Sequence, residues 1–133
     1  MKRVLVQFLI GALWALTINS VFAEQPVVAG VDNTVLAARA IYGTAPVILD
    51  VRTRQEFAAG HLPGAVNIPV SELQERFQEL GLERNDELVV HCRSGKRAAQ
   101  AEALLVAAGF TNVSDLSGHW LAWQSAGLPI DTE

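Results

Sequence analysis

The segment VVHCRSGKR, residues 89–97, contains the single cysteine of the chain, Cys92. A hydrophobic run ends at this thiol, and three cations and one glycine follow within five residues: Arg93, Gly95, Lys96 and Arg97. The thiolate is the reactive form of cysteine, and neighbouring cations or a helix N-terminus lower the thiol pKa from about 8.5 to roughly 3.5–7.5. The alternative is a buried, inert cysteine beside cations that face solvent. Three cations so close to the thiol favour a nucleophilic Cys92 over an inert one.

The same segment has the composition of an anion-binding loop. A strand is predicted to end at His91, Gly95 allows the backbone to curl, and a helix is predicted to begin near Arg97. Backbone N–H groups in such a turn converge on an anion, and the helix dipole adds positive potential. This loop would bind an anionic sulfur substrate and stabilise negative charge as it develops.

The spacing of the loop separates two kinds of chemistry. Cysteine phosphatases use a Cys…Arg loop with five intervening residues, and Ala98 occupies the position of that arginine here. Arg97 instead leaves a gap of four residues, which favours a sulfur oxyanion or a persulfide over a tetrahedral phosphate. A phosphatase or arsenate reductase is therefore a minor alternative.

The segments around this loop alternate between strand and helix patterns. Hydrophobic and β-branched runs predict strands at 46–51, 65–68, 87–91 and 112–116. Helical spacing predicts helices at 34–42, 53–59, 71–80, 97–109 and 119–127, with capping boxes at Thr53/Glu56 and Ser71/Gln74. This alternation predicts a parallel sheet covered on both faces. Ligands bind at the carboxyl ends of such strands, where Cys92 lies.

The N-terminus has the organisation of a secretory signal peptide. Lys2 and Arg3 precede an uncharged stretch over 4–23, and Val21 and Ala23 are the small residues of a cleavage site. A membrane anchor is the alternative, but Gln7, Thr17, Asn19 and Ser20 interrupt the stretch. We therefore expect a cleavable signal peptide at 1–23, a mobile lead-in at 24–33 and one domain at 34–133. Export predicts a periplasmic protein with no stable membrane association after cleavage.

Charge and residue counts exclude several classes of partner. Cleavage would leave 8 basic and 14 acidic residues, a formal charge of −6, which argues against nucleic acid as a partner. One cysteine cannot form an internal disulfide bond, and three isolated histidines have no zinc-site spacing. No apolar stripe calls for a dimer, so a monomer is expected.

Three stretches together resemble the single-domain, rhodanese-like sulfurtransferases of the thiosulfate sulfurtransferase type. They are VILDVRTRQEFAAGHLPGAVNIP, VVHCRSGKRA and LSGHWLAW. The resemblance implies an α/β fold with a five-stranded parallel sheet and helices on both faces. It also implies a ping-pong reaction: Cys92 takes the outer sulfur of thiosulfate, releases sulfite and passes the sulfur from a persulfide to cyanide or a thiol. Neither a metal nor an organic cofactor is implied.

The resemblance assigns roles residue by residue. Cys92 would be the nucleophile, and the cradle for the substrate would be Arg93, Ser94, Gly95, Lys96 and Arg97. Asp50 and Arg52 match the family's Asp-Val-Arg and are interpreted as structural support near the site. His119 replaces the second glycine of a Gly-Gly turn, and we expect it at the rim of the site, where it could tune substrate choice. A periplasmic persulfide carrier that serves a partner protein is the alternative function.

Three further residues are interpreted as structural. His61 is expected to bond to the backbone in a turn, and His91 is expected to point away from Cys92, since neighbouring strand residues face opposite sides. Trp120 is expected on the packed face of the last helix.

Overall fold

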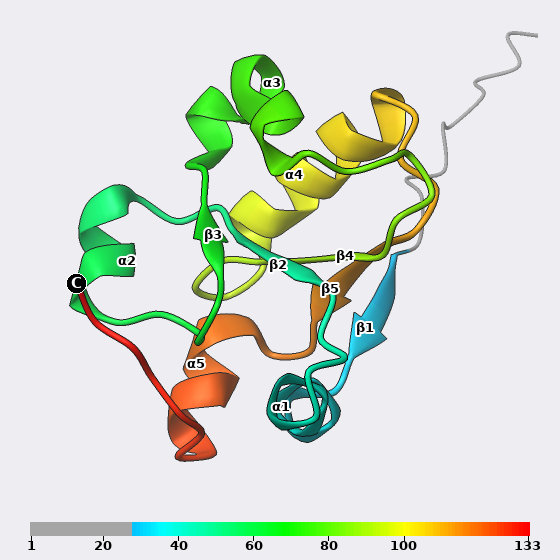
Figure 1. Ribbon diagram of the computed structural model, residues 1–133. Helices are drawn as coiled ribbons and strands as arrows, with labels where there is room; N and C mark the ends of the chain where they lie inside the picture. Colours follow the sequence, from blue (N-terminus) through cyan, green and yellow to red (C-terminus); the bar gives the residue numbers. More distant parts are fainter. Residues whose placement is uncertain (1–27) are drawn as a thin grey trace, which may run out of the picture.

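A computed structural model describes residues 28–133. The proposed signal peptide and the first residues of the lead-in, 24–27, lie outside the described residues. Figure 1 shows a twisted sheet of five strands in the order β1-β5-β4-β2-β3, all parallel. The strands are β1 (Ala29–Val31), β2 (Val47–Asp50), β3 (Val66–Asn67), β4 (Leu88–His91) and β5 (Val113–Leu116). The predicted α/β fold with a five-stranded parallel sheet is confirmed.

Helices cover both faces of this sheet (Figure 1). The longer helices are α1 (Asn33–Ile41), α2 (Arg54–Ala59), α4 (Lys96–Ala107) and α5 (His119–Ser125). A tightly wound segment contains η1 (Val70–Glu72), α3 (Leu73–Arg76) and η2 (Phe77–Leu80). The helices α3 and α4 pack on one face, whereas α1 and α5 pack on the other. No helix within 28–133 is long and apolar enough to cross a membrane.

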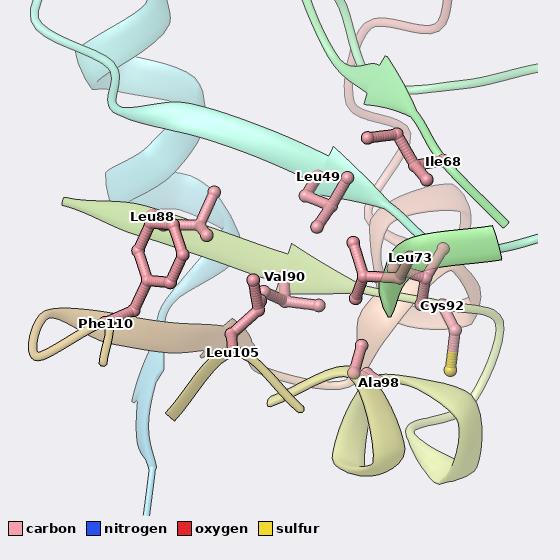
Figure 2. Packing of buried hydrophobic residues seen from close by; sticks show 11 residues of the cluster. Leu49, Ile68, Leu73, Leu88, Val90, Cys92, Ala98, Leu105 and Phe110 are labelled. Atoms are coloured by element: carbon pink, nitrogen blue, oxygen red, sulfur yellow. The ribbon is translucent and has the colours of Figure 1, made fainter. Parts of the chain in front are cut away.

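Alternation along β4 divides the core and sets the direction of the cysteine. Leu88, Val90 and Cys92 belong to the cluster that contains the apolar side of α4 (Figure 2). Val89 belongs to the opposite cluster, with Leu36 of α1 and Trp123 of α5. Because side chains alternate between the faces of a strand, His91 points away from the α4 side on which Cys92 lies. This placement confirms the expected orientation of His91.

Two local predictions were wrong. Ala29–Val31 form β1, an edge strand paired with β5, so this part of the lead-in belongs to the sheet. A three-residue strand with Gly30 at its centre gives a weak periodic signal, which explains why the sequence missed it. The capping box at Ser71/Gln74 does not form, because Ser71 lies inside a 3₁₀ turn and the N-cap of α3 is Glu72. By contrast, the Thr53/Glu56 capping box is complete.

Candidate active site

The segment after β4 turns sharply so that its own backbone contacts the thiol. Gly95 has φ = 120° and is the N-cap of α4, which begins at Lys96, one residue earlier than predicted. The Gly95 N–H donates to Cys92 Sγ across 3.0 Å. Cys92 itself is only 1% exposed. The sulfur therefore lies inside the curl of the loop, against the N-terminus of a 12-residue helix.

The first residues of α5 hold this loop from outside. The Trp120 N–H donates to Cys92 O across 3.0 Å, and the Leu121 N–H donates to Arg93 O across 3.2 Å. These bonds turn the loop carbonyl groups away from the thiol. Within 28–133, the N–H groups of four loop residues have no intramolecular acceptor: Arg93, Ser94, Lys96 and Arg97. Such unpaired N–H groups beside a sulfur can stabilise an anion.

The three cations of the loop have different surroundings. Arg93 and Lys96 are exposed, as is Ser94. Arg97 is half-buried and pairs with Glu56 of α2 through Nη1–Oε2 and Nη2–Oε1 contacts of 2.6 and 2.9 Å. Glu56 offsets part of the charge of Arg97, and attraction of a substrate by the three cations stays a prediction.

The Glu56 carboxylate is a neighbour of the cysteine loop, and the sequence had assigned it only to a helix cap. The Arg97 guanidinium, with help from Thr53, lowers the pKa of Glu56 to about 2, and Glu56 in turn raises the pKa of Arg97. The pair joins α2 to the start of α4. Nothing in the sequence connects these two residues, because the contact depends on how β2 and β4 lie side by side.

Asp50 and Arg52 form a buried ion pair, and their support of the site stays a prediction. The Arg52 Nη2–Asp50 Oδ2 distance is 2.7 Å, and both side chains are at most 3% exposed. Arg52 also donates to Gly60 O and lies over the ring of Trp120 at 4.3 Å. The pair thus ties the end of β2 to α2 and α5.

Asn67 completes this arrangement, and the sequence analysis did not single it out. Its side-chain amide donates to Asp50 O and Arg52 O across 2.9 and 3.0 Å. An asparagine at the end of a short strand is the one available signal, and it is too common to identify this role.

Two histidines have the structural roles that the sequence predicted. His61 donates from Nδ1 to Phe57 O across 2.8 Å and stacks on the Phe57 ring. His91 is fully buried, and its Nε2 lies 3.6 Å from Asp50 Oδ2. Burial lowers the pKa of His91 despite the nearby carboxylate. The contact of His91 with Cys92 joins Nδ1 to the carbonyl oxygen, at 3.2 Å, and not to the thiol.

The structure corrects the expected position of His119. The φ angle is 54°, which confirms that this turn needs the left-handed region, where a non-glycine residue loses about 1 kcal/mol. However, the side chain is 7% exposed and lies behind the loop, where Nδ1 accepts the Cys92 N–H across 3.3 Å. His119 is therefore a buried neighbour of the loop backbone rather than a rim residue.

A hollow of about 240 Å³ opens beside the loop. It is lined by Arg52, Glu56, Ala59, Gly60, Arg93, Trp120 and Gln124. Arg93 belongs both to the cysteine loop and to the lining of this hollow, so the two adjoin. The mixture of the Trp120 ring with polar side chains suits a small amphipathic molecule. Among residues 28–133, no group of three or more His, Cys, Asp or Glu side chains is placed to hold a metal ion.

Comparison with known proteins decides the family. The model of the rhodanese-like domain matches residues 34–126. The chain belongs to the rhodanese-like family. A sulfurtransferase from Allochromatium vinosum is 35% identical over 100 residues, which is 75% of this chain and 92% of that protein. The solution structure of a rhodanese-like domain from Anabaena is 33% identical with a TM-score of 0.71, and the match covers 80% of this chain and 81% of that one.

Other rhodanese-like relatives differ in length and role. A human thiosulfate:glutathione sulfurtransferase is 38% identical over 88 residues, covering 57% of this chain and 76% of that protein. A transcriptional regulator of HTH type from Mycobacterium tuberculosis is 41% identical over 86 residues, but the match spans only 37% of that protein. The Allochromatium vinosum sulfurtransferase matches this chain over almost its whole length. The chain is therefore grouped with the rhodanese-type sulfurtransferases.

Proposed function

We propose that this protein is a thiosulfate sulfurtransferase that carries a sulfane sulfur as a persulfide on Cys92 and passes it to cyanide or a thiol. The observation that carries the proposal is the 3.0 Å contact from the Gly95 N–H to Cys92 Sγ, inside a loop with further unpaired N–H groups. These donors favour an anionic sulfur at this point. They would also stabilise the negative charge once it lies on the outer sulfur of the persulfide.

In the first half-reaction, Cys92 Sγ attacks the outer sulfur of thiosulfate. A new S–S bond forms, the S–S bond of thiosulfate breaks, and sulfite leaves with the electron pair of that bond. Arg93 and Lys96 draw the dianion to the loop, because they are the exposed cations nearest to the thiol in sequence. The loop N–H groups then stabilise the terminal sulfur of the persulfide.

In the second half-reaction, the acceptor attacks the outer sulfur and the Cys92 thiolate leaves. The chain has one cysteine, so an internal disulfide cannot form and the acceptor comes from outside. A thiol acceptor would approach through the hollow beside Arg93, with its apolar part against Trp120 and its polar part near Gln124. The name of the human relative supports a glutathione-like thiol as one such acceptor.

The test is an intact mass measurement after incubation of the reduced protein with thiosulfate. We expect a gain of one sulfur atom on the wild type, its loss on addition of cyanide, and no gain on Cys92→Ser, which keeps the size of the side chain. A folded wild-type protein that takes up no sulfur from thiosulfate would contradict the proposal. Uptake only from a protein persulfide, without multiple turnover, would instead support the carrier function.

A further inference from the structure

His119 makes two contacts with the cysteine loop through one imidazole ring. Its Nδ1 accepts the Cys92 N–H across 3.3 Å. Its Nε2 lies so close to Gly95 that a Cβ added there would be 2.9 Å away. Cys92 and Gly95 are the two residues joined by the N–H contact to Sγ. A single buried ring therefore supports both ends of that contact.

The hydrogen bond also specifies the tautomer of the ring. An acceptor nitrogen carries no proton, so the proton of neutral His119 is on Nε2. Nε2 faces Oδ2 of Asp115, at the end of β5, across 3.7 Å. The carboxylate favours this tautomer electrostatically, since the Nε2–H points toward a negative charge. A second proton on the ring would occupy Nδ1 and remove the acceptor for the Cys92 N–H.

From these contacts, and on the basis of the proposed reaction of Cys92, we propose that neutral His119 is a positioning residue for the thiol. It holds the Cys92 N–H and backs Gly95, so that the Gly95 N–H stays directed at Sγ. Protonation of the ring releases the Cys92 N–H and loosens the loop. The left-handed backbone at position 119, which glycine would adopt freely, is retained because the ring performs this role.

Several ionisable groups surround the ring. Asp115 faces it from β5, Cys92 from the loop and His91 from β4, while Glu102 of α4 interacts electrostatically with Asp115. Burial lowers the pKa of His119, and Asp115 opposes this effect in part. The neutral, accepting form is therefore favoured at neutral pH and is lost on the acid side.

Two variants separate the acceptor from the backbone conformation. His119→Asn keeps an oxygen acceptor near the position of Nδ1, tolerates positive φ and does not titrate. His119→Gly removes the acceptor and relieves the backbone. The primary measurement is the rate of Cys92 alkylation by iodoacetamide between roughly pH 5 and pH 9, because this readout needs no sulfur substrate. Sulfur uptake from thiosulfate is measured in parallel, and thermal unfolding checks that each variant is folded.

We expect His119→Gly to lower the alkylation rate at neutral pH by roughly tenfold and His119→Asn to recover it to within about threefold. The wild type should lose reactivity on the acid side through two ionisations, and both variants through one. Equal rates and equal pH profiles for the wild type and His119→Gly would overturn the proposal, as would an Asn variant that is folded but as slow as Gly. If alkylation behaves as expected but no protein takes up sulfur, the proposed function fails while the positioning role stands.

Discussion

At the scale of single residues, the exposed and the paired cations of the loop have different electrostatic surroundings. Arg93 and Lys96 present their full charge to solvent, whereas the charge of Arg97 is met by Glu56. Exposed charges act mainly by long-range attraction, which salt weakens. The Arg97–Glu56 pair acts instead on the position of the loop.

The first prediction concerns the exposed cations. We expect Arg93→Gln to raise the KM for thiosulfate by about threefold to tenfold, with a stability change of less than about 0.5 kcal/mol. The effect should shrink at high ionic strength. Steady-state kinetics at low and high salt, together with urea unfolding, check this expectation. An unchanged KM at low salt would mean that Arg93 does not attract the donor.

The second prediction concerns the paired cation. Arg97→Gln leaves the Glu56 carboxylate unpaired beside the anion site, so we expect a larger rise in KM and a loss of about 1 kcal/mol of stability. The Arg97→Gln/Glu56→Gln double variant should recover part of both losses, since the unpaired negative charge is gone. Equal KM values for the single and double variants would show that the unpaired charge of Glu56 does not cause the rise in KM.

The pH dependence of the Arg97–Glu56 pair follows from the pKa of Glu56. That pKa is lowered from 4.5 to about 2, so the pair contributes its full stability above about pH 4.5 and loses it as the pH falls toward 2. The difference in stability between the wild type and Glu56→Gln should therefore be constant between roughly pH 6 and pH 8. Urea unfolding at both pH values measures it.

At the scale of the elements, the junction between β4 and α4 depends on a residue without a side chain. Gly95 has a φ angle of 120°, and a Cβ there would meet the His119 ring. An alanine at this position therefore has both a backbone and a steric penalty.

The third prediction separates these two penalties. We expect Gly95→Ala to abolish most alkylation of Cys92 and to lower the unfolding free energy by roughly 2–4 kcal/mol. In the Gly95→Ala/His119→Gly double variant the contact with the ring is gone, so stability should rise while reactivity stays low. Chemical unfolding of the two single variants and the double variant measures the recovery. A double variant no more stable than Gly95→Ala alone would show that the contact with the His119 ring costs no stability and that the backbone penalty accounts for the whole loss.

Sequence patterns predicted elements best where burial is continuous. The strands β2 and β4 are continuous runs of mostly apolar residues, and the buried residues of α4 repeat at helical spacing, so the sequence predicted these three elements. The missed β1 is too short for a period to appear, and its place depends on pairing with β5. Likewise, the cysteine loop was predicted from residue types alone. The Arg97–Glu56 and His119–Cys92 contacts were not, since each joins segments that only the fold brings together.

At the scale of the whole molecule, one buried carboxyl group makes stability depend on pH. Glu102 of α4 is 7% exposed, and its Oε1 has no hydrogen-bond partner among the described residues. Burial first, and the charge of Asp115 second, raise its pKa from 4.5 to about 7. Glu102 therefore binds a proton more tightly in the folded protein than in the unfolded chain.

The fourth prediction follows from the sign of this shift. The folded state gains a proton relative to the unfolded state between about pH 4.5 and pH 7, so stability falls as the pH rises through this window. Glu102→Gln keeps the size of the side chain and removes the charge. We expect the variant to match the wild type near pH 5 and to exceed its unfolding free energy by about 1–3 kcal/mol near pH 8. Urea unfolding at both pH values measures the difference in unfolding free energy between the variant and the wild type. A difference that did not grow with pH would contradict the prediction.

The sheet order also has a consequence for biosynthesis. Ala29 of β1 pairs with Ser114 of β5, and the N–H groups of Trp120 and Leu121 bind the backbone of the cysteine loop. Both β1 and the cysteine loop therefore need the last part of the chain to reach their folded positions. A nascent chain exposes Cys92 to the cell well before the residues that organise its surroundings have been made. Incomplete or truncated products therefore carry the thiol without the contacts that surround it in the folded protein. The cysteine loop thus reaches its folded environment only after the last helix has been translated.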